Sequence, residues 1–230
     1  IAHPSGGQDM SDDVKMTGGP AHSNFIDALS ADLKPVRRLW SPAVRSALWF
    51  AAVGAAALAI ASVSDLPAMA LHISSVPDLW LAITGSVLTG ILGAIAVFQL
   101  SMPDRSPRWA LLPLPAAALW LGASGMGCLR YLLQPGGHFA GIAEAPDCLF
   151  FILGLSLPMS VVMIFATRRA FTLYPARTSA VAGLTIAATA ASMLNLFHPF
   201  DATSTDVLVH ALAIAIVIGA NRYLGGRLLN

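Results

Sequence analysis

The sequence predicts an all-α integral membrane protein, with six transmembrane helices in three antiparallel hairpins and both termini in the cytoplasm. Its composition is the first indication, because 56% of the 230 residues are hydrophobic and only 11% are charged, whereas soluble domains carry about 25% charged residues. Six long apolar runs are the second. The third is the placing of the basic residues in alternate loops, which orients membrane helices. A net charge of +1 argues against direct nucleic-acid binding, which needs a basic surface.

Residues 1–23 are rich in Gly, Ser, Asp and His and show no apolar periodicity. This pattern is typical of a disordered tail or of an upstream extension left from expression. We assign it no function.

Residues 24–42 form a cytoplasmic arm whose first part predicts a short amphipathic helix. Its apolar residues fall on one helical stripe: Phe25, Ile26, Leu29 and Leu33. Pro35 ends the helix, because a residue that precedes proline is disfavoured in the helical region.

Two interpretations of this arm are open from the residues alone. It lies on the inner leaflet, with Lys34, Arg37 and Arg38 on anionic lipid, or its apolar stripe fits a groove of a partner protein. Asp27 and Asp32 oppose an anionic surface.

Residues 43–230 form the membrane domain. Each apolar run in it is close to the ~20 residues that cross the hydrocarbon core, and all must be helical to satisfy their backbone groups. The expected spans are Ala43–Val63, Leu79–Ser101, Trp109–Gly127, Leu149–Thr167, Ser179–Phe197 and Val207–Leu224. Gly90-x-x-x-Ala94 and the alanine-rich fifth run predict close contacts between helices.

The loops predict the orientation. Every Lys and Arg of the chain except Arg130 falls on one side of the six runs. Such asymmetry marks the cytoplasmic side, so both termini are expected in the cytoplasm.

The two cysteines, Cys128 and Cys148, enclose a short polar break on the opposite, extracytoplasmic side. Three interpretations are open: a structural disulfide, a switchable thiol pair that responds to oxidants or soft metals, and two unrelated buried thiols. Arg130 and His138 would favour the thiolate, which both nucleophilic attack and metal binding require.

Further polar residues lie near the same face, with His198 and Asp201 in the last loop and Asp206 and His210 just after it. Histidine and cysteine are ligands of zinc and copper, but no pair has the spacing of a metal motif. We assign no metal and no cofactor. Satisfied interfacial histidines and a helix cap explain these residues equally well.

Enzymatic motifs are missing, since the sequence has no GxSxG, HExxH, Walker A or dinucleotide fingerprint. We expect no enzymatic activity. A small transporter or metal permease, or a periplasm-facing thiol redox protein, are the other classes to consider.

Several short motifs, in this order, resemble the NrsF-like (negative regulator of sigma F) membrane proteins. They are Leu29-Ser-Ala-Asp-Leu-Lys-Pro-Val-Arg-Arg38, Pro103-Asp-Arg-Ser-Pro-Arg-Trp109, Gly127-Cys-Leu-Arg130, Asp147-Cys-Leu-Phe150 and Phe197-His-Pro-Phe-Asp201. The resemblance runs from about residue 24 to the end.

This resemblance implies a six-span anti-sigma factor that holds an extracytoplasmic-function sigma factor inactive at the lipid bilayer. It also implies that Cys128 and Cys148 respond to metal or oxidative stress. From the residues alone, the candidates to support this response are Arg130, His138, His198, Asp201 and His210. The sigma-binding residues would be the apolar stripe and the segment Asp32, Leu33, Lys34, Pro35, Val36, Arg37 and Arg38. Neither the oligomeric state nor the particular sigma factor follows from it.

Overall fold

In the computed structural model, the residues described are 20–31, 40–75, 78–133, 145–168, 170, 172–195 and 204–228. Within them all regular structure is helical. The elements are α1 (Pro20–Ala31), α2 (Pro42–Ala61), α3 (Leu66–Ser75), α4 (Leu79–Leu100), the 3₁₀ helix η1 (Pro107–Leu111), α5 (Leu114–Leu133), α6 (Ala145–Thr167), α7 (Pro175–Leu194) and α8 (Ser204–Leu228).

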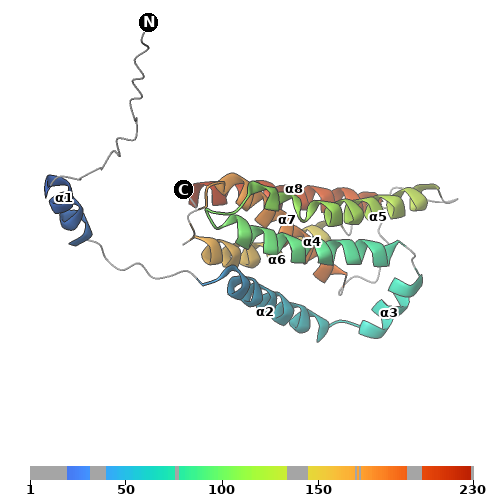
Figure 1. The fold of residues 1–230 in the computed structure, drawn as a ribbon. Helices are drawn as coiled ribbons and strands as arrows, with labels where there is room; N and C mark the ends of the chain where they lie inside the picture. Colours follow the sequence, from blue (N-terminus) through green and yellow to red (C-terminus); the bar gives the residue numbers. More distant parts are fainter. Residues whose placement is uncertain are drawn as a thin grey trace, which may run out of the picture. The chain divides into compact units, whose positions relative to one another are not determined.

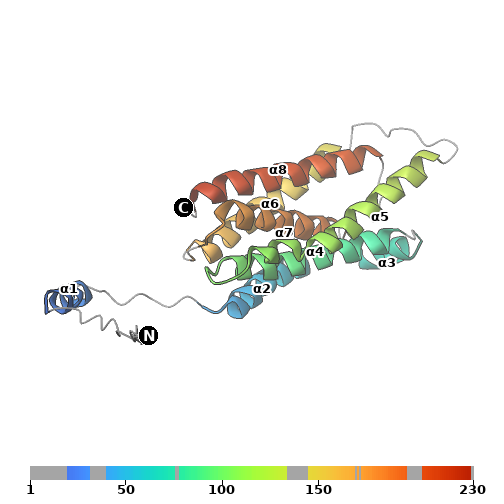
Figure 2. The same ribbon diagram turned by 45° about the horizontal axis from the view of Figure 1, so that its top comes forward.

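The chain divides into two units, residues 1–38 and 39–230. The first contains α1, which begins at Pro20 rather than at residue 24, so its first turn replaces the last part of the expected disordered tail. The second contains the helical bundle, in which α4 to α8 run alongside one another and α2 lies along one side (Figures 1 and 2).

Local sequence explains where several helices of the bundle begin. Ser41 precedes Pro42, and its Oγ accepts the N–H of Val44 at 3.3 Å, an N-cap followed by proline at the first helical position. Ser106 and Pro107 start η1 in the same way, with Ser106 Oγ accepting the N–H of Arg108.

Helix α3 differs from the prediction, because the sequence between the first and second apolar runs predicts a loop. Asp65 caps it by accepting the N–H of Ala68 on Oδ1 at 3.1 Å. Met69 is its buried residue. Pro67, which resembles a loop residue in sequence, lies in the first turn, where its missing N–H costs nothing.

Helix α7 forms the centre of the bundle, packed mainly against α4 and α8 and also against α6. The close approach to α4 follows from glycines: a Cβ at Gly90 would stand 2.9 Å from Thr189 Oγ1, and one at Gly93 would clash with Thr185. Ala94 is fully buried beside them. The predicted close contact through Gly90 and Ala94 is therefore confirmed in the structure.

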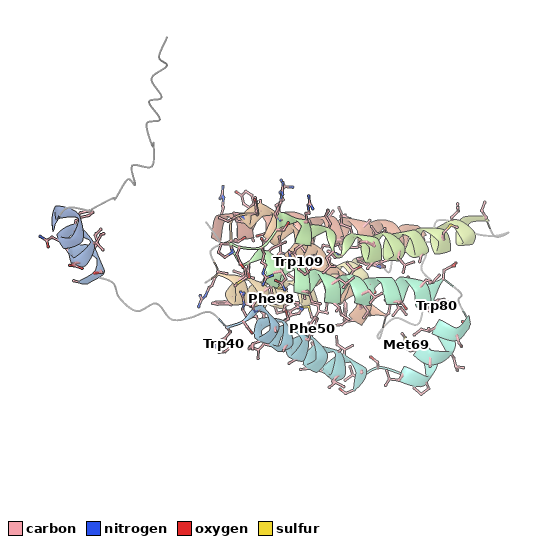
Figure 3. All side chains as sticks on the ribbon, in the orientation of Figure 1. Trp40, Phe50, Met69, Trp80, Phe98 and Trp109 are labelled. Atoms are coloured by element: carbon pink, nitrogen blue, oxygen red, sulfur yellow. The ribbon has the colours of Figure 1, made fainter. Side chains whose placement is uncertain are left out.

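The largest apolar cluster joins α2, α4, α6 and α7, with Phe98, Met163 and Ile186 almost without exposure. Figure 3 shows Phe50, Phe98 and Trp109 in the region where α2, α4 and η1 approach one another. Phe50 and Trp109 pack against this cluster as partly buried residues.

Four of the described helical segments are long and apolar enough to cross a membrane: Pro42–Ala61, Leu79–Leu100, Pro107–Met126 and Phe150–Thr167. In α8 the apolar stretch is shorter, Ala211–Leu224. The six spans and the cytoplasmic placing of both termini stay predictions.

Helices α7 and α8 pack closely, as expected of a hairpin. The expected hairpin of the third and fourth runs stays a prediction. Among the described residues, α5 packs on α4 and α8, while α6 packs on α7 and α8.

Candidate functional site

The amphipathic helix of the arm presents its apolar residues to solvent. Phe25, Ile26 and Leu29 are exposed at 65%, 60% and 57%. Apolar side chains left open on one helical stripe are a feature of binding surfaces. Asp27 is the only Asp, Glu, Lys or Arg in α1, so the helix itself offers no cation to anionic lipid. The remaining arm residues proposed for binding, from Asp32 to Arg38, lie outside the described residues.

The two cysteines lie near the ends of two helices that follow one another in the chain. Cys128 is near the end of α5, and Cys148 is near the start of α6. Arg130 also belongs to α5, and Asp206 and His210 belong to the first turns of α8. For all of these the backbone is described but the side chain is not, while His138, His198 and Asp201 lie outside the described residues. Their roles stay predictions.

Four arginines lie at one end of the bundle: Arg45, Arg105, Arg108 and Arg168. The end of α4 and the α6–α7 connection lie together at this end, since the Thr172 hydroxyl donates to the carbonyl of Leu100 at 3.0 Å. Helix α2 begins there, since Arg45 reaches Ala166 near the end of α6. The loops that carry Arg105, Arg108 and Arg168 therefore meet at one end. This is the charge distribution expected of a cytoplasmic face.

Arg45 differs from its neighbours because it is buried, with 5% exposure. Its Nη1 donates to the carbonyl of Ala166 at 3.5 Å, its Nη2 lies 3.8 Å from Met102 Sδ, and its guanidinium carbon is 5.5 Å from the centroid of the Phe98 ring. Its Nε has no hydrogen-bond partner. In the sequence, Arg45 indicates only which side of the membrane is cytoplasmic, as the other basic residues do. The signal available was that it is the one charged residue within the first apolar run.

A small pocket lies near the same end, lined by residues of α4, α6, α7 and α8. Its volume of about 10 Å³ matches the space that one water molecule needs. Thr167, Thr178 and Asn221 line it, together with Ser179, whose buried Oγ has no partner. An internal water here would satisfy that hydroxyl.

Within the described part of the chain, no group of three or more His, Cys, Asp or Glu residues could hold a metal ion. Most buried hydroxyls instead bond to the carbonyl four residues earlier in their own helix, as Thr185 does to Val181 and Thr189 to Thr185, both at 2.7 Å. Thus the described bundle interior is polar in places, but its polar groups mostly hold the helices themselves.

Together these features define an all-helical protein with several membrane-length helices and an exposed amphipathic segment ahead of them. No curated protein and no solved structure gives a significant match to the chain. A family model does match, and it covers residues 29–230. The chain belongs to the family described as negative regulator of sigma F, NrsF, which confirms the resemblance seen in the motifs. The match includes residues 29–42 of the arm and both cysteines, and it begins after Phe25 and Ile26.

Proposed function

We propose that the chain is a bacterial inner-membrane anti-sigma factor that binds an extracytoplasmic-function sigma factor stoichiometrically, without enzymatic turnover. The family match carries this proposal, since a negative regulator of a sigma factor implies a sigma factor as partner. The exposed stripe of Phe25, Ile26 and Leu29 supports the arm as the binding segment. Partner grooves commonly bind an amphipathic helix through such spaced apolar residues.

A pull-down from membranes tests this function. The full chain is expected to retain a cytoplasmic sigma factor, and Leu29→Asp is expected to lose it, because a carboxylate cannot enter an apolar groove without a partner. Asn24→Asp is the matched control: it adds the same charge to the same exposed helix, on the face away from the stripe. Arg37→Glu tests the basic part of the arm. Retention of sigma by both Leu29→Asp and Arg37→Glu would refute binding through the arm.

The second part of the proposal is that a periplasmic metal or oxidative signal acts at Cys128 and Cys148 to release the sigma factor. Both cysteines lie near helix ends, Cys128 in α5 and Cys148 in α6, so a chemical change at either is applied directly to a long helix of the bundle. Single Cys128→Ser and Cys148→Ser variants are expected to retain sigma at rest and to lose its stimulus-dependent release. A normal response in both variants would mean that the thiols have no role in sensing.

A further inference from the structure

Helix α2 connects the arm, which precedes it in the chain, to the bundle. Only two of its residues are buried, Arg45 and Trp49. They are four positions apart and therefore share one helical face. The rest of α2 is exposed or partly exposed. Its attachment combines this buried pair near its first turns with partly buried residues that pack along the same side on the largest apolar cluster: Phe50, Val53, Ala56, Ala57 and Ile60. We call the buried pair the α2 clamp.

The α2 clamp contacts the ends of two other helices. Trp49 belongs to the apolar cluster that includes Phe98 of α4 and Met163 of α6. Arg45 lies over the Phe98 ring and donates to Ala166 of α6. Any movement of the last turns of α6 relative to α4 must therefore change the surroundings of both clamp residues.

The polar part of the α2 clamp is incompletely satisfied. The Arg45 contacts to Ala166 at 3.5 Å and to Met102 at 3.8 Å are long, compared with about 2.7–3.2 Å for a good N–H···O bond. Its Nε is buried without a partner, and among the described residues no carboxylate pairs with it. An arginine this close to a helix start can extend its head group to water, yet this one is turned inward. A buried cation held in this way offsets part of the free energy that α2 gains from its apolar contacts with the bundle.

Helix α6 links this clamp to the cysteine region, because Cys148 lies near its start and Ala166 near its end. Pro158 lies inside α6 and removes the N–H that would bond to the carbonyl of Gly154, which is the usual cause of a bend in a helix. A Cβ at Gly154 would meet nothing within 4 Å, so this position of α6 is not packed against the described helices. The half of α6 after Pro158 contains Met163 and Ala166, both used by the clamp.

We propose that the α2 clamp is the switch through which the bundle controls the arm. In the docked state Arg45 and Trp49 hold α2, and with it the base of the arm, in the position that retains the sigma factor. Displacement of the Pro158–Thr167 half of α6 withdraws the Ala166 carbonyl and Met163, α2 separates from the bundle, and retention is lost. This inference rests on the proposed function for its consequence, but the docking of α2 can be measured by itself.

Two substitutions at Arg45 are expected to act in opposite directions. Arg45→Met keeps an unbranched side chain of similar length and removes the unpartnered buried donors, which stabilises docking. Arg45→Glu places an unpaired carboxylate against a backbone carbonyl, which destabilises it. In cells carrying a sigma-dependent reporter, Arg45→Glu is expected to raise unstimulated output, and Arg45→Met to lower stimulated output, each on the order of tenfold.

Arg168→Met and Arg168→Glu are the matched controls, because Arg168 lies at the same end and stacks on Phe165 at 4.1 Å but is exposed. Both are expected to leave the reporter unchanged. If Arg45 only fixes membrane orientation through its charge, Met and Glu would shift the reporter in the same direction. That outcome would overturn the switch.

Docking itself is measured by pulsed electron spin resonance between labels at Leu48→Cys and Val162→Cys, two exposed positions of α2 and α6, in the full chain with both native cysteines changed to serine. The distance distribution is expected to be narrow for the parent and for Arg45→Met, and broad for Arg45→Glu. Identical distributions in all three would overturn the clamp. A parent chain that binds no sigma factor would refute the proposed function. The spin-label distances would still show whether Arg45 holds α2 against the bundle.

Discussion

Helices α2 and α7 have the same length, 20 residues, and both begin with proline, but they occupy opposite environments. Helix α2 buries two residues and is apolar enough to cross a membrane. Helix α7 buries most of its residues, is rich in Thr and Ser, and is not among the described helices that reach that level of hydropathy.

The comparison shows what hydropathy measures in such a chain. A helix that contacts lipid must be apolar, because its surface has no other partner. A helix surrounded by other helices needs small residues for close approach and satisfied polar groups. Helix α7 has Gly183 against α8, and its threonine hydroxyls bond to its own backbone. Its buried Ser179 hydroxyl is the exception, since it has no partner.

The largest difference between the two helices is expected from shortening an apolar side chain. Ile186→Ala in α7 removes a side chain with 0% exposure and should lower the free energy of unfolding by about 2–5 kcal/mol. Leu58→Ala in α2, where the side chain is 73% exposed, should change it by less than about 0.5 kcal/mol. Denaturant titration in detergent, followed by circular dichroism, measures both. Equal losses would mean that α2 is packed as tightly as α7.

Adding a methyl group to a glycine should sharpen the comparison by changing stability in opposite directions. At Gly183 a Cβ would lie 2.6 Å from the Cα of Ile218, so Gly183→Ala should force the α7–α8 backbones apart and cost about 1–3 kcal/mol. At Gly54 of α2 nothing lies within 4 Å, so Gly54→Ala should gain about 0.5–1 kcal/mol from the better helix former. Thermal unfolding of the two variants should show melting temperatures on opposite sides of the parent, and a rise for Gly183→Ala would contradict the close approach.

The smallest effect concerns the hydrogen bond that joins α7 to α4, from Ser192 Oγ to Ser86 Oγ at 2.9 Å. Because Ser192 also donates to the carbonyl of Ala188 at 2.8 Å, the interhelical bond competes with one inside α7. A double-mutant cycle of Ser86→Ala and Ser192→Ala should give a coupling of about 0.6 kcal/mol. Strictly additive single effects would show that the bond makes no contribution.

The sequence predicted α2 and α4 to within about two residues, because an apolar run bounded by Ser-Pro or by Asp is an unambiguous signal. It missed α3, since Pro67 and the polar residues around it resemble a loop. The ends of α5 and α6 extend beyond the predicted spans, so Cys128, Arg130 and Cys148 lie on helices rather than in the break itself.

The candidate site was predictable only in its residue types. The amphipathic pattern of Phe25, Ile26 and Leu29 is visible in the sequence, and all three are exposed in the structure. Their role in binding stays a prediction. The burial of Arg45 did not follow, because burial depends on Phe98, Met102 and Ala166, which lie far away in the sequence. The residues next to Arg45 in the sequence do not indicate which distant residues will pack around it.

The close contact between Gly93 of α4 and Thr185 of α7 also has a consequence for how the chain folds during synthesis. Translation proceeds from the N-terminus, so α4 and its glycine face are complete long before α7 leaves the ribosome. Until then this face has no matching surface, and a chain that stops after α6 cannot close it. Assembly in the proposed membrane setting is therefore decided late, when α7 enters, and unfinished copies offer an open glycine face that cellular quality control can recognise.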